Sequence, residues 1–273
     1  PARQAVIYAG LDLGVEATTI NKVCASGMKT AMMAAQSITS GYRDVMIAGG
    51  MESMSNIPYY LPDARSGHRM GHKQVLDGII YDGLWDIYNN QHMGMCGEAC
   101  ADSQGISRAD QDAYAKLSYE RAAAAWKAGK FADEVSPMTI LGKRGKPDII
   151  VSEDEEFSSF KVDSLPSQKP AFKKDGTVTA GNASGINDGA AAMILMSGRA
   201  AKAHGTKPLF KIRGFGDAAR APVEFTIAPA DAVPRALAHA GLTAKDIDYH
   251  EINEAFSVVA LANAQILGLD IDR

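Results

Sequence analysis

A cysteine between a β-prone run and a helix of small residues constrains the fold of this chain more than any other feature. Residues 18–23 favour a strand, residues 27–40 have the composition of a helix, and residues 44–48 form a short apolar run before two glycines. Such an apolar run is typical of a buried parallel strand. Strand, helix and strand at this spacing predict a βαβ-like unit and an α/β fold.

Cys24 lies at the junction of the predicted strand and helix. Helix N-termini carry partial positive charge and free N–H groups, which favour a thiolate over a thiol. The small residues Ala25, Ser26 and Gly27 would let a substrate carbonyl approach the backbone closely. A buried, inert cysteine is the alternative, because free thiols are so often buried. The position at the head of a helix favours an acyl-accepting nucleophile, and spacing alone leaves both interpretations open.

The rest of the chain divides by pattern. Residues 52 to about 170 are rich in loops, with helices expected over residues 90–104 and 108–128, Ser107 as the N-cap of the second, and a β-prone run at Ile149–Val151. After this region, segments typical of strands and segments typical of helices alternate again. This alternation predicts strands over residues 191–196, 209–215 and 248–253, and helices over residues 198–204, 229–240 and 254–267.

Composition excludes several function classes. A net charge of −4 gives no reason to expect nucleic acid or an anionic membrane surface as partner, and no apolar run approaches transmembrane length. Three cysteines cannot form a disulfide framework and suggest a reducing compartment. The chain starts without Met inside a helical pattern and stops without a closing element, so we expect an internal piece of a longer chain.

His92 lies near the start of a predicted helix and shares a face with Cys96 and Cys100. A core or capping histidine is the ordinary interpretation, and zinc is disfavoured because a fourth ligand is missing. Four lysines come closest to forming a local basic cluster. Ordinarily such residues form a solvated surface; alternatively, they bind a phosphate-bearing substrate. The four lysines are Lys161, Lys169, Lys173 and Lys174.

Two segments of small or polar residues are candidate ligand contacts. Residues 180–189 lack the order of a nucleotide phosphate loop, so a backbone crowded against a ligand or a partner strand is the better interpretation. Ser184 either bonds a ligand amide or is a turn serine. Asn253 either caps the helix that follows it or holds a water or a carbonyl oxygen with its amide.

Taken together, these pieces resemble the thiolase family. The matching motifs occur in family order over nearly the whole chain, and residues 86–89 and 225–229 look most like the acetoacetyl-CoA thiolase (acetyl-CoA C-acetyltransferase) branch. The motifs are Asn21-Lys22-Val23-Cys24-Ala25-Ser26-Gly27-Met28-Lys29, Ala48-Gly49-Gly50-Met51-Glu52-Ser53-Met54-Ser55, His92-Met93-Gly94, Gly176-Thr177-Val178-Thr179-Ala180-Gly181-Asn182-Ala183-Ser184 and Asn253-Glu254-Ala255-Phe256.

The resemblance implies an acyltransferase whose Cys24 takes an acetyl group as a thioester, with ping-pong kinetics. Two acetyl-CoA would give acetoacetyl-CoA and free coenzyme A, reversibly. The implied fold is α/β and thiolase-like, with two doubly wound mixed-sheet halves, both incomplete, and an inserted loop domain. Residues 1–51 would belong to the N-terminal half, 52–170 to a loop domain that binds coenzyme A, 171–198 to the return, and 199–273 to the start of the C-terminal half.

The resemblance also assigns site residues. Asn253 would hold a water in an oxyanion hole. In one member of this branch potassium lies near the equivalents of Tyr119, Ala180, Gly181 and Ala183, but Gly181 and Thr226 depart from that pattern; no other metal or redox cofactor is implied. The substrate-binding residues would be Leu84, His92, Met93, Tyr119, Phe172, Ala180, Ser184, Ala255 and Phe256.

Two family features have no counterpart in these residues: the histidine that activates the nucleophile and the second cysteine that moves the α-proton. We therefore expect that residues 1–273 alone do not turn over, since general acid–base catalysis contributes about 10²–10⁴-fold. Acyl-CoA substrates are the implied partners. A homodimer or homotetramer is expected, with open sheet edges and residues 62–73 as contact surface. The cytoplasm is favoured, with mitochondrion and peroxisome as alternatives.

Three other functions compete. A 3-ketoacyl-CoA thiolase for longer chains would use the same site, and a one-methylene preference in an apolar pocket is typically about 10–200-fold. A non-catalytic lipid carrier on the same fold would not need Cys24. A cysteine hydrolase built on Cys24 and His92 would need an Asp or Asn to orient the histidine.

Overall fold

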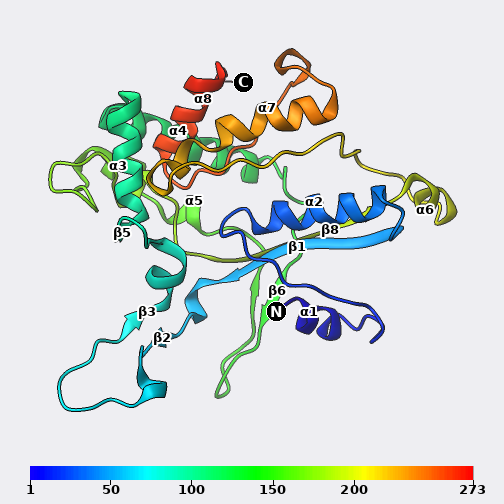
Figure 1. The fold of residues 1–273 in the computed structure, drawn as a ribbon, viewed down its shortest axis with the longest axis horizontal. Coiled ribbons are helices and arrows are strands. Elements are labelled where there is room, and N and C mark those ends of the chain that lie inside the picture. The colour runs from blue at the N-terminus through cyan, green and yellow to red at the C-terminus, as the bar shows by residue number, and fades with distance from the viewer. Residues whose placement is uncertain (273) are drawn as a thin grey trace. The chain divides into compact units, whose positions relative to one another are not determined.

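The structure is a computed structural model that describes residues 1–272. The chain forms two compact units, each assembled from segments that are distant in sequence. The first unit combines residues 1–83 with residues 186–215. The second combines residues 84–185 with the residues from 216 onward. Figure 1 shows the course of the chain through the elements of both units.

The first unit is built on one pair of long antiparallel strands with a helix on one face (Figure 1). In this pair Val45 lies opposite Met196 and Ser53 opposite Asp188. The small core between helix and sheet contains Ala34, Ala48 and Leu195. The elements are α1 (Ala2–Tyr8), α2 (Ser26–Thr39), β1 (Val45–Ser53), β8 (Asp188–Met196) and α6 (Gly198–Ala203), with the short pair β2 (Tyr59–Tyr60) and β3 (Leu76–Asp77).

Small residues let α2 lie directly on β1. A Cβ atom added to Gly50 would stand 3.2 Å from the Cα atom of Gly27, so a side chain there would separate the two elements. The Thr30 hydroxyl donates to the Gly49 carbonyl oxygen (3.0 Å) and accepts from the Gly49 N–H (3.1 Å). Gly41, with φ of +75°, then follows the helix, as is usual for a residue in the left-handed conformation. These contacts fix the start of α2 relative to the sheet.

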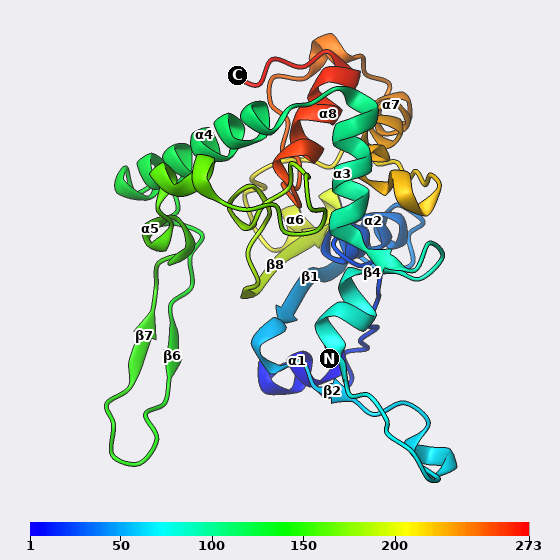
Figure 2. The ribbon, with the colours of Figure 1, turned by 90° about the vertical axis from the view of Figure 1, so that its left-hand side faces the viewer.

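The second unit is mainly helical. Its core joins residues of three distant segments, among them Cys100, Val178 and Phe256. α3 and α8 lie side by side (Figure 2). The helices are α3 (Met93–Gln104), α4 (Arg108–Lys127), α5 (Glu156–Ser159), α7 (Pro229–Ala240) and α8 (Ser257–Leu267), and the strand pairs are β4 (Trp85–Asp86) with β5 (Gln91–His92) and β6 (Met138–Ile140) with β7 (Ile149–Val151).

Short helical turns connect these elements. The 3₁₀ turn η5, directly after Thr179, is closed by a reciprocal pair of hydrogen bonds: the Asn182 N–H donates to the Thr179 hydroxyl and the Thr179 N–H to the Asn182 side chain. The short turns are η1 (Met54–Asn56), η2 (Ala64–Ser66), the π-helical η3 (Ile79–Leu84), η4 (Val162–Ser167), η5 (Ala180–Asn182), η6 (Pro222–Ile227) and η7 (Ala244–Asp246). None of the helices within residues 1–272 is long and apolar enough to cross a membrane.

Several predictions from the sequence are confirmed. Ser107 caps α4, and Asp110 completes a reciprocal capping box with it. The predicted strand over residues 191–196 lies inside β8, and the helix predicted over residues 229–240 is α7. Ile149–Val151 forms β7 as expected.

Three predicted strands do not form. Residues 18–23, 209–215 and 248–253 have no regular strand structure, and only an isolated bridge joins Lys22 and Cys24. β propensity describes how a side chain fits a paired surface rather than an intrinsic backbone preference. These runs have no ladder partner within residues 1–272, so their β-branched residues do not produce strands.

Other boundaries and directions also differ. The apolar run at residues 44–48 belongs to an antiparallel pair, not a parallel one, because its partner is β8. The helix predicted from residue 90 starts at Met93, and the one predicted from residue 254 starts at Ser257. The strands of residues 1–272 pair only as four two-stranded antiparallel sheets, so these residues form neither the predicted βαβ unit nor the mixed sheets of the two expected halves.

Candidate active site

Cys24 is exposed on a tight turn immediately before α2. The Val23 N–H donates to the Asn21 side-chain oxygen (2.9 Å), and the Ser26 hydroxyl donates to the Val23 carbonyl (2.6 Å) while it accepts from the Lys22 N–H (2.7 Å). Val23 has φ of +49°, a left-handed conformation that is rare for a β-branched residue. Strained backbone of this kind occurs where the surrounding structure enforces it, often at a nucleophile.

The turn therefore holds the thiol outward, next to the positive end of α2. Cys24 is therefore not a buried cysteine. The predicted strand before it is replaced by the hydrogen-bonded turn of residues 21–26. Cys24 belongs to the first unit, whereas the other predicted site residues belong to the second.

His92 is the N-cap of α3. The Gly94 N–H donates to His92 Nδ1 (3.0 Å), so that nitrogen carries no proton and the neutral ring holds its proton on Nε2. Burial lowers the pKa of His92 from its ordinary value of 6.5. The capping role expected for an ordinary histidine is thus confirmed, and the same bond leaves Nε2–H as a donor for a ligand.

A row of three rings lies beside this cap. The rings of His92 and Phe172 stack with their centroids 4.6 Å apart, and Phe172 meets Phe256 edge to face at 6.3 Å. Gly94 makes this possible, because a Cβ atom there would lie 2.3 Å from Phe172 Cδ2. The structure therefore brings three predicted substrate-binding residues together in one unit.

The small-residue segment pairs with the segment that follows Asn253. The Ser184 N–H donates to the Ala255 carbonyl (3.0 Å), and an isolated antiparallel bridge joins Ala183 and Phe256. The prediction that this segment lies against a partner strand is close to the observation. Phe256 is buried in the core, whereas Ser184 is exposed at the surface.

Asn253 is exposed and does not cap a helix. α8 starts at Ser257, and its N-cap is Phe256, without a side-chain cap. The capping interpretation of Asn253 is therefore wrong. The reason is that Phe256, buried in the core and bridged to Ala183, has an extended backbone, so the first helical turn begins only at Ser257. The Asn253 amide is left at the surface of the second unit.

Glu98 is a functional candidate that the sequence analysis missed. Its side chain is 2 % exposed, and its two carboxylate oxygens accept from the N–H groups of Thr177 and Val178 at 2.8–2.9 Å. The Thr177 hydroxyl adds a third donor at 3.0 Å. An acid between Cys96 and Cys100, in the apolar first half of α3, was the signal that could have revealed it.

Tyr119 lies on α4 and stacks on Phe160, with ring centroids 4.2 Å apart. Its hydroxyl donates to Glu156 (3.3 Å). Burial and then the negative charge of Glu156 raise the pKa of Tyr119 to about 12, and Asp154 and Glu254 act in the same direction. Tyr119 is therefore a neutral hydroxyl in negative surroundings.

The remaining predicted residues have simpler environments. Leu84 and Met93 are half-buried, and Ala180 is exposed beside buried Gly181. Lys173 forms an ion pair with Asp102 (3.1 Å). Burial raises the pKa of the Cys96 and Cys100 thiols, which disfavours the thiolate form of both. Within residues 1–272 no group of three or more His, Cys, Asp or Glu side chains could hold a metal ion.

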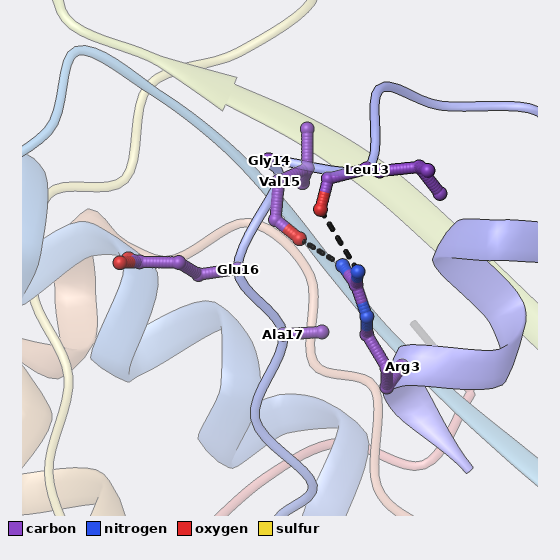
Figure 3. A pocket seen from close by; sticks show the side chains of 6 residues that line it. All are labelled: Arg3, Leu13, Gly14, Val15, Glu16 and Ala17. Carbon is purple, nitrogen blue, oxygen red and sulfur yellow. Dashed lines mark hydrogen bonds between the residues drawn. The ribbon is translucent and has the colours of Figure 1, made fainter.

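A hollow of about 360 Å³ in the first unit lies elsewhere (Figure 3). Arg3 lines this hollow, and its guanidinium donates to the carbonyls of Val15 (2.6 Å) and Leu13 (2.8 Å). Glu16 at its edge is paired with Arg43. None of the predicted site residues lines the hollow. Its two charged side chains, Arg3 and Glu16, are already bonded to other groups of the protein, so we do not place the site there.

Comparison with protein families gives two adjacent matches. The model described as thiolase, N-terminal domain, matches residues 1–199, and the model described as thiolase, C-terminal domain, matches residues 206–273. Among curated proteins, acetyl-CoA acetyltransferase 1 of Arabidopsis thaliana is 55 % identical over the whole of this chain. Mitochondrial acetyl-CoA acetyltransferase of Mus musculus is 52 % identical over 99 % of it. The chain spans 66 % and 63 % of the lengths of these two relatives.

Solved structures agree. The Acat5 thiolase from Ascaris suum, crystallised in complex with coenzyme A, superimposes on 98 % of this chain with a TM-score of 0.92 and 42 % identity. The acetyl-CoA acetyltransferase from Syntrophomonas wolfei superimposes on all of it with a TM-score of 0.94 and 38 % identity. The chain covers 68 % and 69 % of those two proteins. The thiolase-like fold expected from the motifs is thereby confirmed.

Proposed function

This chain belongs to the thiolase family, and on that premise we propose that its protein is an acetyl-CoA acetyltransferase that joins two acetyl-CoA into acetoacetyl-CoA and free coenzyme A, reversibly. The observation that carries the proposal is the exposed thiol of Cys24, held outward on a strained turn at the head of α2. The high identity to named acetyl-CoA acetyltransferases supports the choice of substrate.

In the first half-reaction the Cys24 thiolate attacks the thioester carbonyl of acetyl-CoA. The carbon–sulfur bond to coenzyme A breaks, its thiolate leaves, and acetyl-Cys24 forms. In the second half-reaction the α-carbon of another acetyl-CoA gives up a proton to a base and attacks acetyl-Cys24. Cys24 leaves as a thiolate and acetoacetyl-CoA is released. Within the family, the histidine that activates the thiol and the cysteine that takes the α-proton lie outside the motifs matched in these residues.

Asn253 is proposed to stabilise the oxyanion through a water held by its exposed amide. A preorganised donor at the developing charge is worth about 10²–10³ in kcat. The exposure of Asn253, with no role as a helix cap, supports this assignment.

Coenzyme A is proposed to lie along the second unit. The Nε2–H of neutral His92 is a donor for the thioester end, next to Met93 and the stacked ring of Phe172. Leu84, Ala180 and Ser184 would contact the pantetheine, and Ala255 and Phe256 would line the acyl pocket. The exposure of Ala180, at the start of the hydrogen-bonded turn η5, and of Ser184 supports this path.

Potassium is proposed as an accessory ion near Tyr119. Hydroxyl and backbone carbonyl oxygens are the ligands that potassium takes, and the carboxylates of Glu156, Asp154 and Glu254 make this region negative. Tyr119 would supply a hydroxyl oxygen and Ala180, Gly181 and Ala183 backbone carbonyl oxygens to such an ion, which would order the turn η5 when bound. If so, thiolysis rates should rise when sodium is replaced by potassium at constant ionic strength.

We also propose a homodimer or homotetramer. The segment between β2 and β3 extends away from the rest of the first unit (Figure 1) and carries exposed Met70 among five basic or imidazole side chains. Sedimentation equilibrium tests this, since Met70→Glu should lower the association state. A monomeric wild-type protein would contradict the proposal.

The function is tested by thiolysis of acetoacetyl-CoA with purified full-length protein. We expect coenzyme A-dependent loss of substrate, fastest with the four-carbon acyl group. Faster thiolysis of longer 3-ketoacyl-CoA would favour the long-chain alternative. Hydrolysis of simple thioesters without coenzyme A would favour a cysteine hydrolase, and absence of any reaction would favour a carrier.

A further inference from the structure

Glu254, directly after Asn253, forms hydrogen bonds that the motif of residues 253–256 does not explain. Its side chain is half-buried, and both carboxylate oxygens accept hydrogen bonds from α4. The Tyr114 hydroxyl donates to Oε1 (2.8 Å) and the Ser118 hydroxyl donates to Oε2 (2.6 Å). Because residues four apart share one face of a helix, the two donors form a clamp with a fixed separation.

The backbone on the other side of Asn253 is not held in this way. Residues 248–253 have no regular structure, and Tyr249 is 71 % exposed. After Asn253 the chain is anchored three times in succession: Glu254 by the clamp, Ala255 through its carbonyl to Ser184, and Phe256 in the core. Glu254 is thus the first anchored residue next to Asn253.

From this arrangement we propose that Glu254 is a positioning residue, which sets the backbone at Asn253 and thereby the direction of the Asn253 amide. The inference rests on the proposed function, because it takes Asn253 as the oxyanion group. Glu254 itself touches no reacting atom. It acts through its neighbour, and the hydroxyls of Tyr114 and Ser118 act through Glu254.

Helix α4 is suited to this task because it also holds the opposite segment of the proposed site. Its Asp112 accepts from the Asn182 amide (3.0 Å), and its Gln111 amide donates to the Thr177 hydroxyl (2.9 Å). One helix therefore contacts both the turn at Ala180–Asn182, through Asp112, and the residue after Asn253, through Tyr114 and Ser118. Movement of the clamp would displace one segment relative to the other.

The test is a double-mutant cycle on the full-length protein. The clamp is removed by Tyr114→Phe with Ser118→Ala, which leaves Glu254 in place, and the group it positions is removed by Asn253→Ala. Glu254→Gln is the conservative variant, since its amide oxygen can still accept from one hydroxyl. Glu120→Gln is the matched control, because Glu120 is an exposed acid on α4 that pairs with Lys116 of the same helix (3.8 Å).

We expect loss of the clamp to lower kcat about 10- to 100-fold with the KM for acetoacetyl-CoA changed less than about twofold, since misplacement near 1 Å can cost about 10²-fold. In the Asn253→Ala background the same two substitutions should lower kcat by less than about twofold, because sites that act as a unit are not additive. Glu254→Gln should lie between wild type and the clamp variant, and Glu120→Gln should match wild type.

Additive losses in the two backgrounds, or a loss seen only in KM or in the thermal unfolding midpoint, would overturn the inference and leave the proposed function standing. Should the clamp variant unfold, Glu254→Gln in both backgrounds decides by the same criterion. Full activity of Asn253→Ala would overturn the inference together with the role of Asn253. The proposed function fails separately, if the wild-type protein does not cleave acetoacetyl-CoA.

Discussion

At the scale of single residues, the thiol and its turn were the most predictable part of the site. The order Cys24, Ala25, Ser26, Gly27 correctly indicated a turn at the head of a helix, because each residue type acts locally. Glu98 and Glu254 could not be assigned roles in this way, since their partners lie 79 and 140 positions away in the chain. Long-range hydrogen bonds leave no local pattern in a sequence.

Gly94 is predicted to be irreplaceable by alanine. The added methyl group would stand 2.3 Å from Phe172 Cδ2, so the ring must leave its stack on His92. Overpacking of this kind costs about 1–3 kcal/mol. Urea unfolding of Gly94→Ala should show that loss and a raised KM for coenzyme A. Gly198→Ala is the control, because a Cβ atom at Gly198 meets nothing within 4 Å; equal behaviour of the two variants would refute the steric argument.

His92 is predicted to make stability depend on pH. Its pKa in the folded state is below the ordinary 6.5, so the unfolded chain binds more protons than the folded one between these two values. Stability should therefore fall as the pH drops through 6.5 toward the folded pKa. His92→Asn keeps a side-chain acceptor for the Gly94 N–H and lacks the titrating ring.

The urea midpoint of wild-type protein, measured between pH 7.5 and 5, should consequently fall more steeply than that of His92→Asn. The two tryptophans, Trp85 and Trp126, lie in the second unit and report its unfolding by fluorescence. Parallel pH profiles for the two proteins would show that His92 does not contribute.

At the scale of elements, helices were predicted better than strands. α2, α4 and α7 carry their own signals, such as the capping pair Ser107 and Asp110 or the glycine after a helix end. A strand instead depends on a partner. β1 was found as a strand, but its antiparallel direction came from β8, more than 130 residues later. The β-prone residues 18–23 failed as a strand for the same reason.

The cap of α4 gives a prediction at this scale. Ser107 accepts from the Asp110 N–H (3.2 Å) and satisfies one of the free donors at the helix start. Ser107→Ala should lower the free energy of unfolding by about 1 kcal/mol. Ser103→Ala is a suitable control, because the exposed Ser103 hydroxyl caps no helix: it donates to the Cys100 carbonyl (3.1 Å) and accepts from the side chain of neighbouring Gln104 (3.5 Å). A change of less than about 0.3 kcal/mol for Ser107→Ala would contradict the capping energy expected here.

At the scale of the whole molecule, five collinear motifs were enough to identify the family, and the comparisons confirm it. Without the family resemblance, the residue patterns predict only a cysteine nucleophile on an α/β scaffold. The division at residues 51, 170 and 198 stays a prediction, as do the roles of the individual site residues. They could not be derived locally because each compact unit is assembled from two distant stretches of chain.

The central claim is that Cys24 carries the acyl group between two coenzyme A thioesters. It is tested most directly by mixing the full-length protein with acetyl-CoA, quenching in acid and locating the acetyl group by peptide mass spectrometry. We predict one acetyl thioester on Cys24, lost on addition of coenzyme A and absent in Cys24→Ser. Acetylation at another residue, or an active enzyme whose Cys24 remains unmodified and open to iodoacetamide throughout turnover, would contradict the account.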